Sequence, residues 1–116
     1  MGLSWLGGLR AVVVAGESMT PGLRPGDCLL VRPGARVGPG DVVLARHPFV
    51  PGLLLVKRVA QAVDGGWWLL SDNADAGIDD SRAFGVVPAE NIVGRVLLRY
   101  YPWRWSTRGV GVPSRS

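Results

Sequence analysis

LLLVKRV, residues 53–59, is an apolar run of strand length that contains Lys57, the one lysine of the chain. Successive side chains of a β-strand point to opposite faces, so Lys57 shares a face with Leu55 and Val59 while Arg58 points the other way. A short apolar run of this kind, bounded by turn residues, is typical of a buried strand. The segment therefore predicts a β-fold that holds an amine among aliphatic side chains.

Five other segments have similar length and composition, and turns rich in Gly and Pro separate them. None has a sustained helical period, so the sequence predicts an all-β domain of six or more strands. Helix is expected only in short pieces, after Ser18 or around Pro88–Asn91. The predicted strands are Arg10–Ala15, Cys28–Arg32, Val42–Arg46, Leu53–Ala62, Trp67–Leu70 and Ile92–Tyr101.

Two of the predicted strands follow the same tripeptide. Pro25-Gly26-Asp27 precedes the first, and Pro39-Gly40-Asp41 precedes the second, 14 residues later. Pro then Gly suits the central positions of a type II turn, where Gly takes a positive φ without a Cβ clash. We expect similar turns at both places, and a true repeat and two unrelated turns both stay open as the origin.

Length and composition restrict the possible functions. The 116 residues suit one domain, residues 1–105, followed by a flexible tail, residues 106–116, rich in Gly, Ser and Arg. One Cys and one His cannot supply a disulfide or a zinc site, so no metal and no cofactor are expected. The +4 charge comes from scattered Arg and does not favour nucleic acid. No apolar stretch is long enough to span a bilayer, and a cytoplasmic location is expected.

The polar segment Ser71–Gly85 contains four Asp residues and is expected to be a loop. An EF-hand register starting at Ser71 fails, because Ala76 replaces the required Gly and Arg82 stands where a bidentate Glu is needed. Two interpretations stay open. One is a solvated acidic loop, and the other is a structured loop that pairs Asp80 with Arg82 beside an active site.

Ser18 lies just after the first predicted strand, in GESMTP, residues 16–21. A turn at this point can expose the hydroxyl and turn the Ser18 N–H outward, which supplies a nucleophile and an oxyanion donor. A serine at a strand end is more often only a turn former. The motif therefore indicates catalysis only if a base lies beside it.

His47 and Lys57 are the candidate bases. His47 precedes Pro48 in a predicted loop, and nothing in the sequence identifies the third member of a Ser-His-Asp triad. Burial among aliphatic side chains would lower the pKa of Lys57, whereas an arginine there would stay protonated. The alternative is a lysine whose amine reaches solvent from the end of the strand.

Four motifs follow one another along the chain, namely Gly16-x-Ser18-Met19-x-Pro21-x-Leu23-x-x-Gly26-Asp27, then Lys57-Arg58-Val59, then Asp72-Asn73, then Asp80-Ser81-Arg82-x-x-Gly85. In this order and spacing they resemble the boxes of the type I signal peptidase family of serine proteases. Gly66-Trp67-Trp68 and Gly94-Arg95-Val96-x-Leu98-Arg99-Tyr100-x-Pro102 look closest to a compact branch, the maturation proteases of nickel-type superoxide dismutase.

The resemblance implies a coiled, mostly antiparallel sheet that forms a partly open barrel and carries a Ser/Lys dyad. Ser18 would attack the peptide carbonyl, and its N–H would bind the oxyanion. Lys57 would be the general base. Family members often carry a hydroxyl two residues before the nucleophile, where this chain has Gly16.

The resemblance also implies where substrate binds and what shapes the site. The peptide would add as a strand beside Ala15, Gly16, Glu17 and Met19 on one side and Leu55 and Val56 on the other. Asp80, Ser81 and Arg82 would shape the site, with Asp80 and Arg82 as an ion pair. The group that orients Lys57 is left open between Ser71 and Ser81.

The expected function is a serine endopeptidase that removes an N-terminal propeptide from a precursor protein, with the proenzyme of nickel-type superoxide dismutase as the partner. One alternative is a signal peptidase that cleaves secretory signal peptides, for which Trp103-Arg104-Trp105 could contact a membrane. Another is a non-enzymatic peptide-binding β-module. A self-cleaving repressor is not expected, since only 17 residues precede Ser18.

Overall fold

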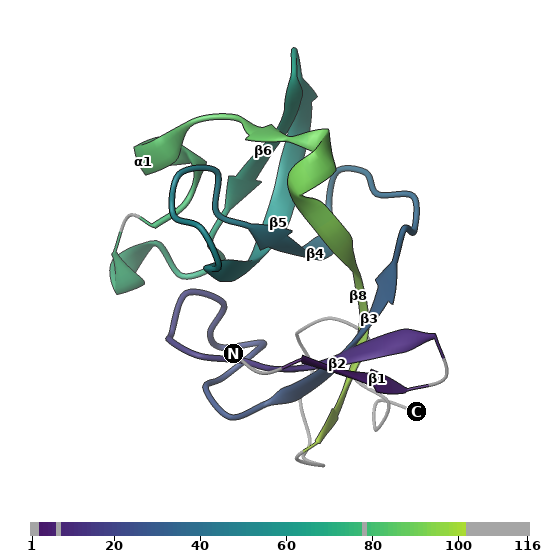
Figure 1. Cartoon of the computed structure of the whole chain (residues 1–116). Coiled ribbons are helices and arrows are strands. Elements are labelled where there is room, and N and C mark those ends of the chain that lie inside the picture. The colour runs from purple at the N-terminus through teal and green to yellow at the C-terminus, as the bar shows by residue number, and fades with distance from the viewer. Residues whose placement is uncertain (1–2, 7, 78, 102–116) are drawn as a thin grey trace.

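A computed structural model describes residues 3–6, 8–77 and 79–101 of the chain. Within these residues, eight strands form one antiparallel sheet in the order β1-β2-β3-β8-β4-β5-β6-β7 (Figure 1). This confirms the all-β prediction. The strands are β1 Leu3–Leu6, β2 Leu9–Val13, β3 Cys28–Pro33, β4 Val42–Arg46, β5 Leu54–Val63, β6 Gly66–Leu70, β7 Val87–Pro88 and β8 Ile92–Tyr101.

The six predicted strands are all present, with ends that differ from the prediction by at most two residues. The sequence did not indicate β1 and β7. β7 has only two residues, Val87 and Pro88, and pairs with Gly66 and Trp67 at the edge of the sheet. β7 is too short to display an alternating pattern, and the four residues of β1, LSWL, do not alternate strictly between apolar and polar, so only the pairing partner defines each strand.

Strand β8 joins the two halves of the sheet. It pairs with β3 along Leu29↔Arg99 to Pro33↔Gly94 and with β4 at Val43↔Arg95. Both pairings contain register shifts, and such irregularities bend strands and increase their twist. The sheet therefore curls into the coiled, partly open arrangement that was predicted, with β1–β3 in one half and β4–β6 in the other (Figure 1).

Gly94 lies on β8 where the strand passes from β3 to β4. A Cβ at this position would overlap the backbone carbonyl of Arg32 on β3. Only glycine allows the two backbones to approach so closely. The bend between the halves of the sheet therefore depends on this residue.

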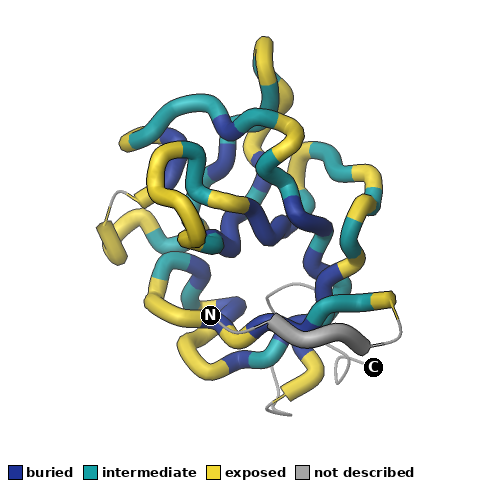
Figure 2. Tube along the Cα trace, viewed as in Figure 1, coloured by how far each residue is buried: buried dark blue, intermediate teal, exposed yellow. Residues whose placement is uncertain are grey.

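Two groups of buried residues form the core. Figure 2 marks the buried residues in dark blue along the chain. The first lies between the halves of the curled sheet and includes Val12, Leu29, Leu44, Val96 and Met19. The second packs on the outer part of the lysine-bearing half, with members on β4, β5, β6 and β7. Both the segment after β2 and strand β5, which carry the candidate catalytic residues, are therefore anchored in packed apolar side chains.

The two Pro-Gly-Asp segments form similar turns, as predicted. Gly26 and Gly40 have φ of 91° and 93°, so each needs the left-handed conformation that glycine tolerates. Asp27 accepts a hydrogen bond from the Arg24 N–H at 2.8 Å, and Asp41 accepts one from the Gly38 N–H at 2.9 Å. The carboxylates thus close both turns in the same way.

Among the described residues, helix occurs only in short pieces, as predicted, and at one of the two places that the sequence offered. A 3₁₀-helix, η2, covers Ala89–Asn91 as expected. The segment after Ser18 forms turns instead, because Pro21 has no N–H to donate to a helix. The predicted loop Ser71–Gly85 contains two short helices, η1 Ala74–Ala76 and α1 Ser81–Phe84. Their N-caps are the side chains of Asn73 and Asp80.

Three expectations fall wholly or partly outside the described residues. They are the flexible tail 106–116, the membrane contact at Trp103-Arg104-Trp105, and the end of the protease domain at residue 105. In the part of the chain that is described, no helix has the length and apolarity to cross a membrane.

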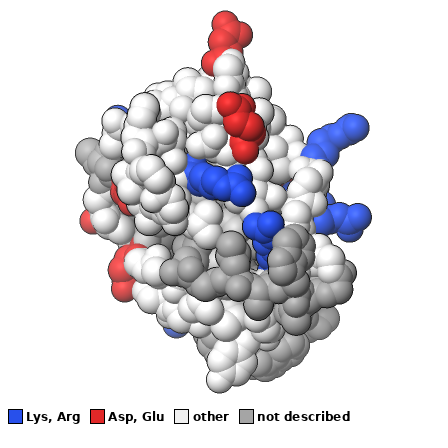
Figure 3. Space-filling view, viewed as in Figure 1, with Lys and Arg blue, Asp and Glu red and all other residues white. Residues whose placement is uncertain are grey.

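On the face drawn in Figure 3, basic side chains are separated by uncharged surface.

Candidate active site

Ser18 follows β2 on a loop whose base is closed by main-chain hydrogen bonds. Val14 donates to the Asp27 carbonyl at 2.8 Å, and Gly26 donates to the Val14 carbonyl at 2.9 Å. Gly16, with φ of 82°, turns the chain away from the strand direction. Met19 is 1% exposed and anchors the loop in the core. Ser18 is thus a half-buried residue next to a fixed anchor.

The buried side chain of Arg99 holds the Ser18 loop in place. It projects from β8, is 1% exposed, and donates from Nη1 to the Gly22 carbonyl at 3.2 Å. The same nitrogen lies 3.8 Å from the carboxylate of Asp27, which is equally buried. The loop that carries Ser18 is therefore tied to the strand that joins the two halves of the sheet.

Lys57 lies in the middle of β5 and is 2% exposed. Leu55 and Val59 on the same face are also buried, as the alternation predicted. Burial is the main cause that lowers the pKa of Lys57, while the negative charges of Asp79 and Asp80 act in the opposite direction. A lowered pKa favours the neutral amine, which is the form that can accept a proton.

Ser71 is the residue that orients Lys57. The Lys57 amine donates to Ser71 Oγ over 3.0 Å. Ser81, the other candidate left open by the sequence, accepts a hydrogen bond from the Leu69 N–H at 2.9 Å and holds β6 instead. An amine that donates one N–H to Ser71 keeps a defined direction for its lone pair when it is neutral.

Asp80 holds the segment that carries Ser71. Its buried carboxylate accepts the Ser71 N–H at 2.9 Å and pairs with Arg82 over 2.8 Å. Burial alone would raise the pKa of Asp80, but hydrogen bonds from the Arg82 side chain and from the Ser71 and Arg82 N–H groups, with the Arg82 charge, outweigh it and lower the pKa to about 2. The expected Asp80–Arg82 pair is present and acts on Lys57 through Ser71.

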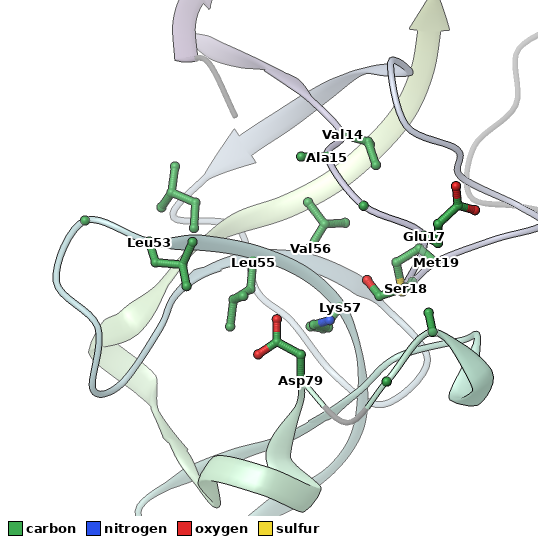
Figure 4. A pocket seen from close by; sticks show the side chains of 15 residues that line it. Val14, Ala15, Glu17, Ser18, Met19, Leu53, Leu55, Val56, Lys57 and Asp79 are labelled. Carbon is green, nitrogen blue, oxygen red and sulfur yellow. The ribbon is translucent and has the colours of Figure 1, made fainter.

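A cavity of about 300 Å³ lies between the Ser18 loop and β5. Figure 4 shows the Ser18 hydroxyl directed toward the Lys57 amine, with the Asp79 carboxylate on the other side of that amine. All eight residues predicted for catalysis or substrate contact line the cavity, which are Ala15, Gly16, Glu17, Ser18, Met19, Leu55, Val56 and Lys57. Because the Met19 side chain is almost fully buried, its contribution is restricted to a small surface.

Of the two polar main-chain groups of Ser18, only the carbonyl has a hydrogen-bond partner among the described residues. Its carbonyl accepts the Asn73 N–H at 2.8 Å. Its N–H has no hydrogen-bond partner among the described residues. A free N–H beside the nucleophile is what an oxyanion hole requires. Gly16 supplies no side-chain donor, as the sequence indicated.

Asn73 is a site residue whose role the sequence did not reveal. Its side-chain amide donates to Thr20 Oγ1 at 2.7 Å and to the Glu17 carbonyl at 3.3 Å. Together with the main-chain bond to Ser18, these contacts join the serine loop to the segment after β6. The signal was the Asp72-Asn73 motif itself, since Asn side chains readily bond to nearby backbone.

His47 lies outside the cavity lining. Its Nδ1 accepts N–H groups of Phe49 and Val50 in the loop between β4 and β5, at 3.0 and 3.1 Å. The nitrogen that would serve as a base is thus engaged by the protein's own backbone. Of the two bases considered from the sequence, only Lys57 lines the cavity with Ser18.

Sequence comparison places this fold and cavity among known peptidases. The Peptidase S24-like family matches residues 4–97, most of the chain. The chain belongs to this family. Two curated relatives of this S24-like peptidase are mitochondrial inner membrane protease subunit 1 of Xenopus tropicalis and mitochondrial ATP-independent inner membrane protease subunit 1a of Arabidopsis thaliana. The first is 31% identical over 117 residues, with 80% of this chain and 70% of the relative covered. The second is 33% identical over 116 residues, with coverage of 77% and 68%.

These comparisons support the protease assignment at the level of the family. The chain is an S24-like peptidase with a fold of the signal peptidase type, as the resemblance implied. The names of both relatives refer to mitochondrial inner membrane proteases and not to superoxide dismutase maturation. The finer assignment to that branch therefore rests on the sequence motifs alone.

Proposed function

We propose that this S24-like peptidase is a serine endopeptidase with a Ser18/Lys57 dyad, and that it removes an N-terminal segment from a precursor protein. One observation carries the proposal. The Lys57 amine is buried, is held by Ser71, and faces the Ser18 hydroxyl in an open cavity. A lysine that only reached solvent from a strand end would be exposed, whereas Lys57 is 2% exposed.

Acylation begins when neutral Lys57 takes the proton of the Ser18 hydroxyl. The serine oxygen attacks the scissile carbonyl carbon, and the negative charge moves to the carbonyl oxygen. The Ser18 N–H donates to this oxyanion. Lys57, now an ammonium, gives its proton to the departing amine as the carbon–nitrogen bond breaks, which leaves an ester between Ser18 and the N-terminal segment.

Deacylation repeats the proton transfers with water. Lys57 takes a proton from a water molecule that attacks the ester carbonyl, and then returns a proton to Ser18 Oγ as the ester bond breaks. The N-terminal segment leaves as a carboxylic acid. Throughout, Ser71 holds the amine and Asp80 holds Ser71. Ser71 contacts the Lys57 amine directly and Asp80 acts through Ser71, so both residues position the base.

The substrate is proposed to bind as an extended strand in the cavity. Ala15, Gly16 and Glu17 are exposed and form one wall, while Leu55 and Val56 form the other. Extended peptides bind such sites through main-chain hydrogen bonds, and alternate side chains enter pockets. This arrangement presents the scissile carbonyl to Ser18 without requiring a deep tunnel.

The proposed substrate is the proenzyme of nickel-type superoxide dismutase. What supports it is the likeness of Gly66-Trp67-Trp68 and of the segment Gly94–Pro102 to that branch of proteases. The test is incubation of the proenzyme with wild type, Ser18→Ala and Lys57→Met, followed by mass spectrometry of its N-terminus. Arg46→Met, which removes an exposed cation from β4, is the matched control and should cleave normally.

The result separates three outcomes. Loss of cleavage in the Ser18 and Lys57 variants with retention in the Arg46 variant supports the dyad. Cleavage by both dyad variants refutes it. Cleavage of other precursors but not of the superoxide dismutase proenzyme leaves the dyad in place and refutes the substrate.

A second candidate function is cleavage of exported or imported precursors at a membrane. It is favoured by the words "inner membrane protease" in the names of both relatives. These names also favour a membrane surface over the cytoplasmic location expected from the sequence. Flotation of the protein with lipid vesicles separates the two locations, and a panel of secretory and mitochondrial precursors separates the substrates.

A further inference from the structure

We propose that the loop between β4 and β5, residues 47–53, is an apolar rim of the substrate cavity that binds an apolar side chain of the precursor, away from the cleaved bond. This inference rests on the proposed protease function and specifies its substrate. Its occupant is the substrate peptide proposed above for the cavity, since the loop continues directly into the cavity wall at Gly52 and Leu53.

The first observation is the exposure of this loop. Phe49, Val50 and Leu53 are 72%, 46% and 41% exposed, although they are large apolar residues. They supply half of the strongly exposed large apolar side chains found in the described residues. The segment HPFVPGL contains no acidic or basic side chain other than His47. Apolar surface at the edge of a cavity favours an apolar ligand.

The second observation is that the loop is held in one shape. His47 Nδ1 accepts the N–H groups of both Phe49 and Val50. The Leu53 N–H donates to the Val50 carbonyl at 3.2 Å, and the His47 N–H donates to the Leu53 carbonyl at 2.8 Å. The His47 ring packs on Phe84 of α1 with 4.6 Å between ring centroids. A surface ordered in advance loses less entropy when it binds.

The third observation is the position of the rim relative to the dyad. Figure 1 shows the loop on the same side of the molecule as the Ser18 loop, and Figure 4 shows Leu53 on the cavity wall that leads to Lys57. Leu53 is four residues before Lys57. At about 3.3 Å per residue, a peptide strand along this wall reaches Leu53 roughly four residues from the cleaved bond, and Phe49 lies beyond.

The test compares two precursors and two enzymes. One precursor carries apolar residues roughly four to six positions from the cleaved bond, as the strand spacing predicts, and the other carries serines there. The enzymes are wild type and the double variant Phe49→Ser with Val50→Ser. We expect the double variant to lower kcat/KM about tenfold on the apolar precursor through a higher KM, since two apolar contacts are lost. On the serine precursor, wild type and the double variant should have similar kcat/KM values.

Two further variants keep the test specific. Val13→Ser changes an apolar residue on β2 that is 42% exposed and does not line the cavity, and it should distinguish the two precursors as wild type does. His47→Asn retains an acceptor for the loop N–H groups and should preserve the preference, whereas His47→Ala should reduce it. Thermal melting of each variant verifies folding.

Several results would overturn the proposal. If the double variant loses the same factor in kcat/KM on both precursors, the loop does not bind the apolar residues of the substrate. Unchanged cleavage together with loss of binding to phosphatidylglycerol vesicles in the double variant assigns the loop to a membrane surface instead. Absence of cleavage by wild type refutes the underlying protease function. The rim is then tested separately, by measuring the Kd of the apolar peptide for Ser18→Ala with and without the two loop substitutions. An equal Kd for both proteins overturns the rim.

Discussion

Replacing Asp80 by Asn should destabilise the protein in a manner that depends on pH. Asp80 is fully buried and its pKa is lowered from 3.8 to about 2. A carboxyl whose pKa is lower in the folded state adds stability above its unfolded pKa and loses it as the pH falls through its folded pKa. The difference corresponds to about 2 kcal/mol in the free energy of unfolding at pH 7.

The assay is urea unfolding followed by circular dichroism, at intervals from pH 7 to pH 2. Asp80→Asn should unfold about 2 kcal/mol more easily than wild type at pH 7, and the difference should shrink below pH 4 to under ~1 kcal/mol near pH 2. Wild type and variant share all other titrating groups. The difference between their free energies of unfolding therefore reports the contribution of the Asp80 carboxylate alone.

Asp72→Asn is a matched control, because Asp72 directly follows Ser71 and pairs with Arg58 over 2.8 Å. The side chains of that pair are 34% and 29% exposed, so water screens their charges. Its loss should cost less than ~1 kcal/mol. If the two substitutions cost the same, or if the Asp80 difference stays constant down to pH 2, then the buried charge is not what stabilises this segment.

The remaining predictions concern the dyad, its loop and the bend of the sheet. Lys57→Met should abolish cleavage and raise the melting temperature at neutral pH, because it removes an amine whose protonation is penalised by burial; a lower melting temperature would contradict this. Asp79→Asn should move the acid limb of the kcat/KM profile to lower pH, since Asp79 raises the pKa of Lys57, and a shift to higher pH would be contrary evidence. Asn73→Ala should cost about 1 kcal/mol in chemical unfolding and reduce kcat, because it removes the two side-chain hydrogen bonds to the Ser18 loop and leaves only the main-chain bond to the Ser18 carbonyl; unchanged kcat would mean that this main-chain bond is enough to position the loop. Gly94→Ala should destabilise by roughly 1–3 kcal/mol or more in the same assay, owing to overlap with the Arg32 carbonyl, and wild-type stability would show that β8 can shift.

The strands and the face of Lys57 could be predicted because they depend on local alternation. Apolar runs bounded by Pro and Gly located β2 to β6 and β8, and the two-residue period of β5 assigned Lys57 to the buried face that it shares with Leu55 and Val59. The two similar Pro-Gly-Asp turns followed from the same local chemistry. These features need no knowledge of what packs against them.

The supporting contacts of the site could not be predicted from the sequence. Ser71 and Ser81 were equivalent candidates, and only the cap formed by Asp80 at α1 directs one to Lys57 and the other to β6. The roles of Asn73 and His47 likewise depend on segments distant in the chain or on loop geometry. Such contacts arise from the three-dimensional arrangement, which a linear pattern does not encode.

The position of β8 in the sheet has a consequence for the synthesis of the enzyme. Ser18 belongs to the β2–β3 half and Lys57 to the β4–β5 half, and in the strand order β8 is the element inserted between them. It is also the last strand along the described chain, at residues 92–101. The proposed nucleophile and base therefore take their places in one sheet only after β8 has been synthesised, so proteolytic activity should not begin before translation has passed residue 101.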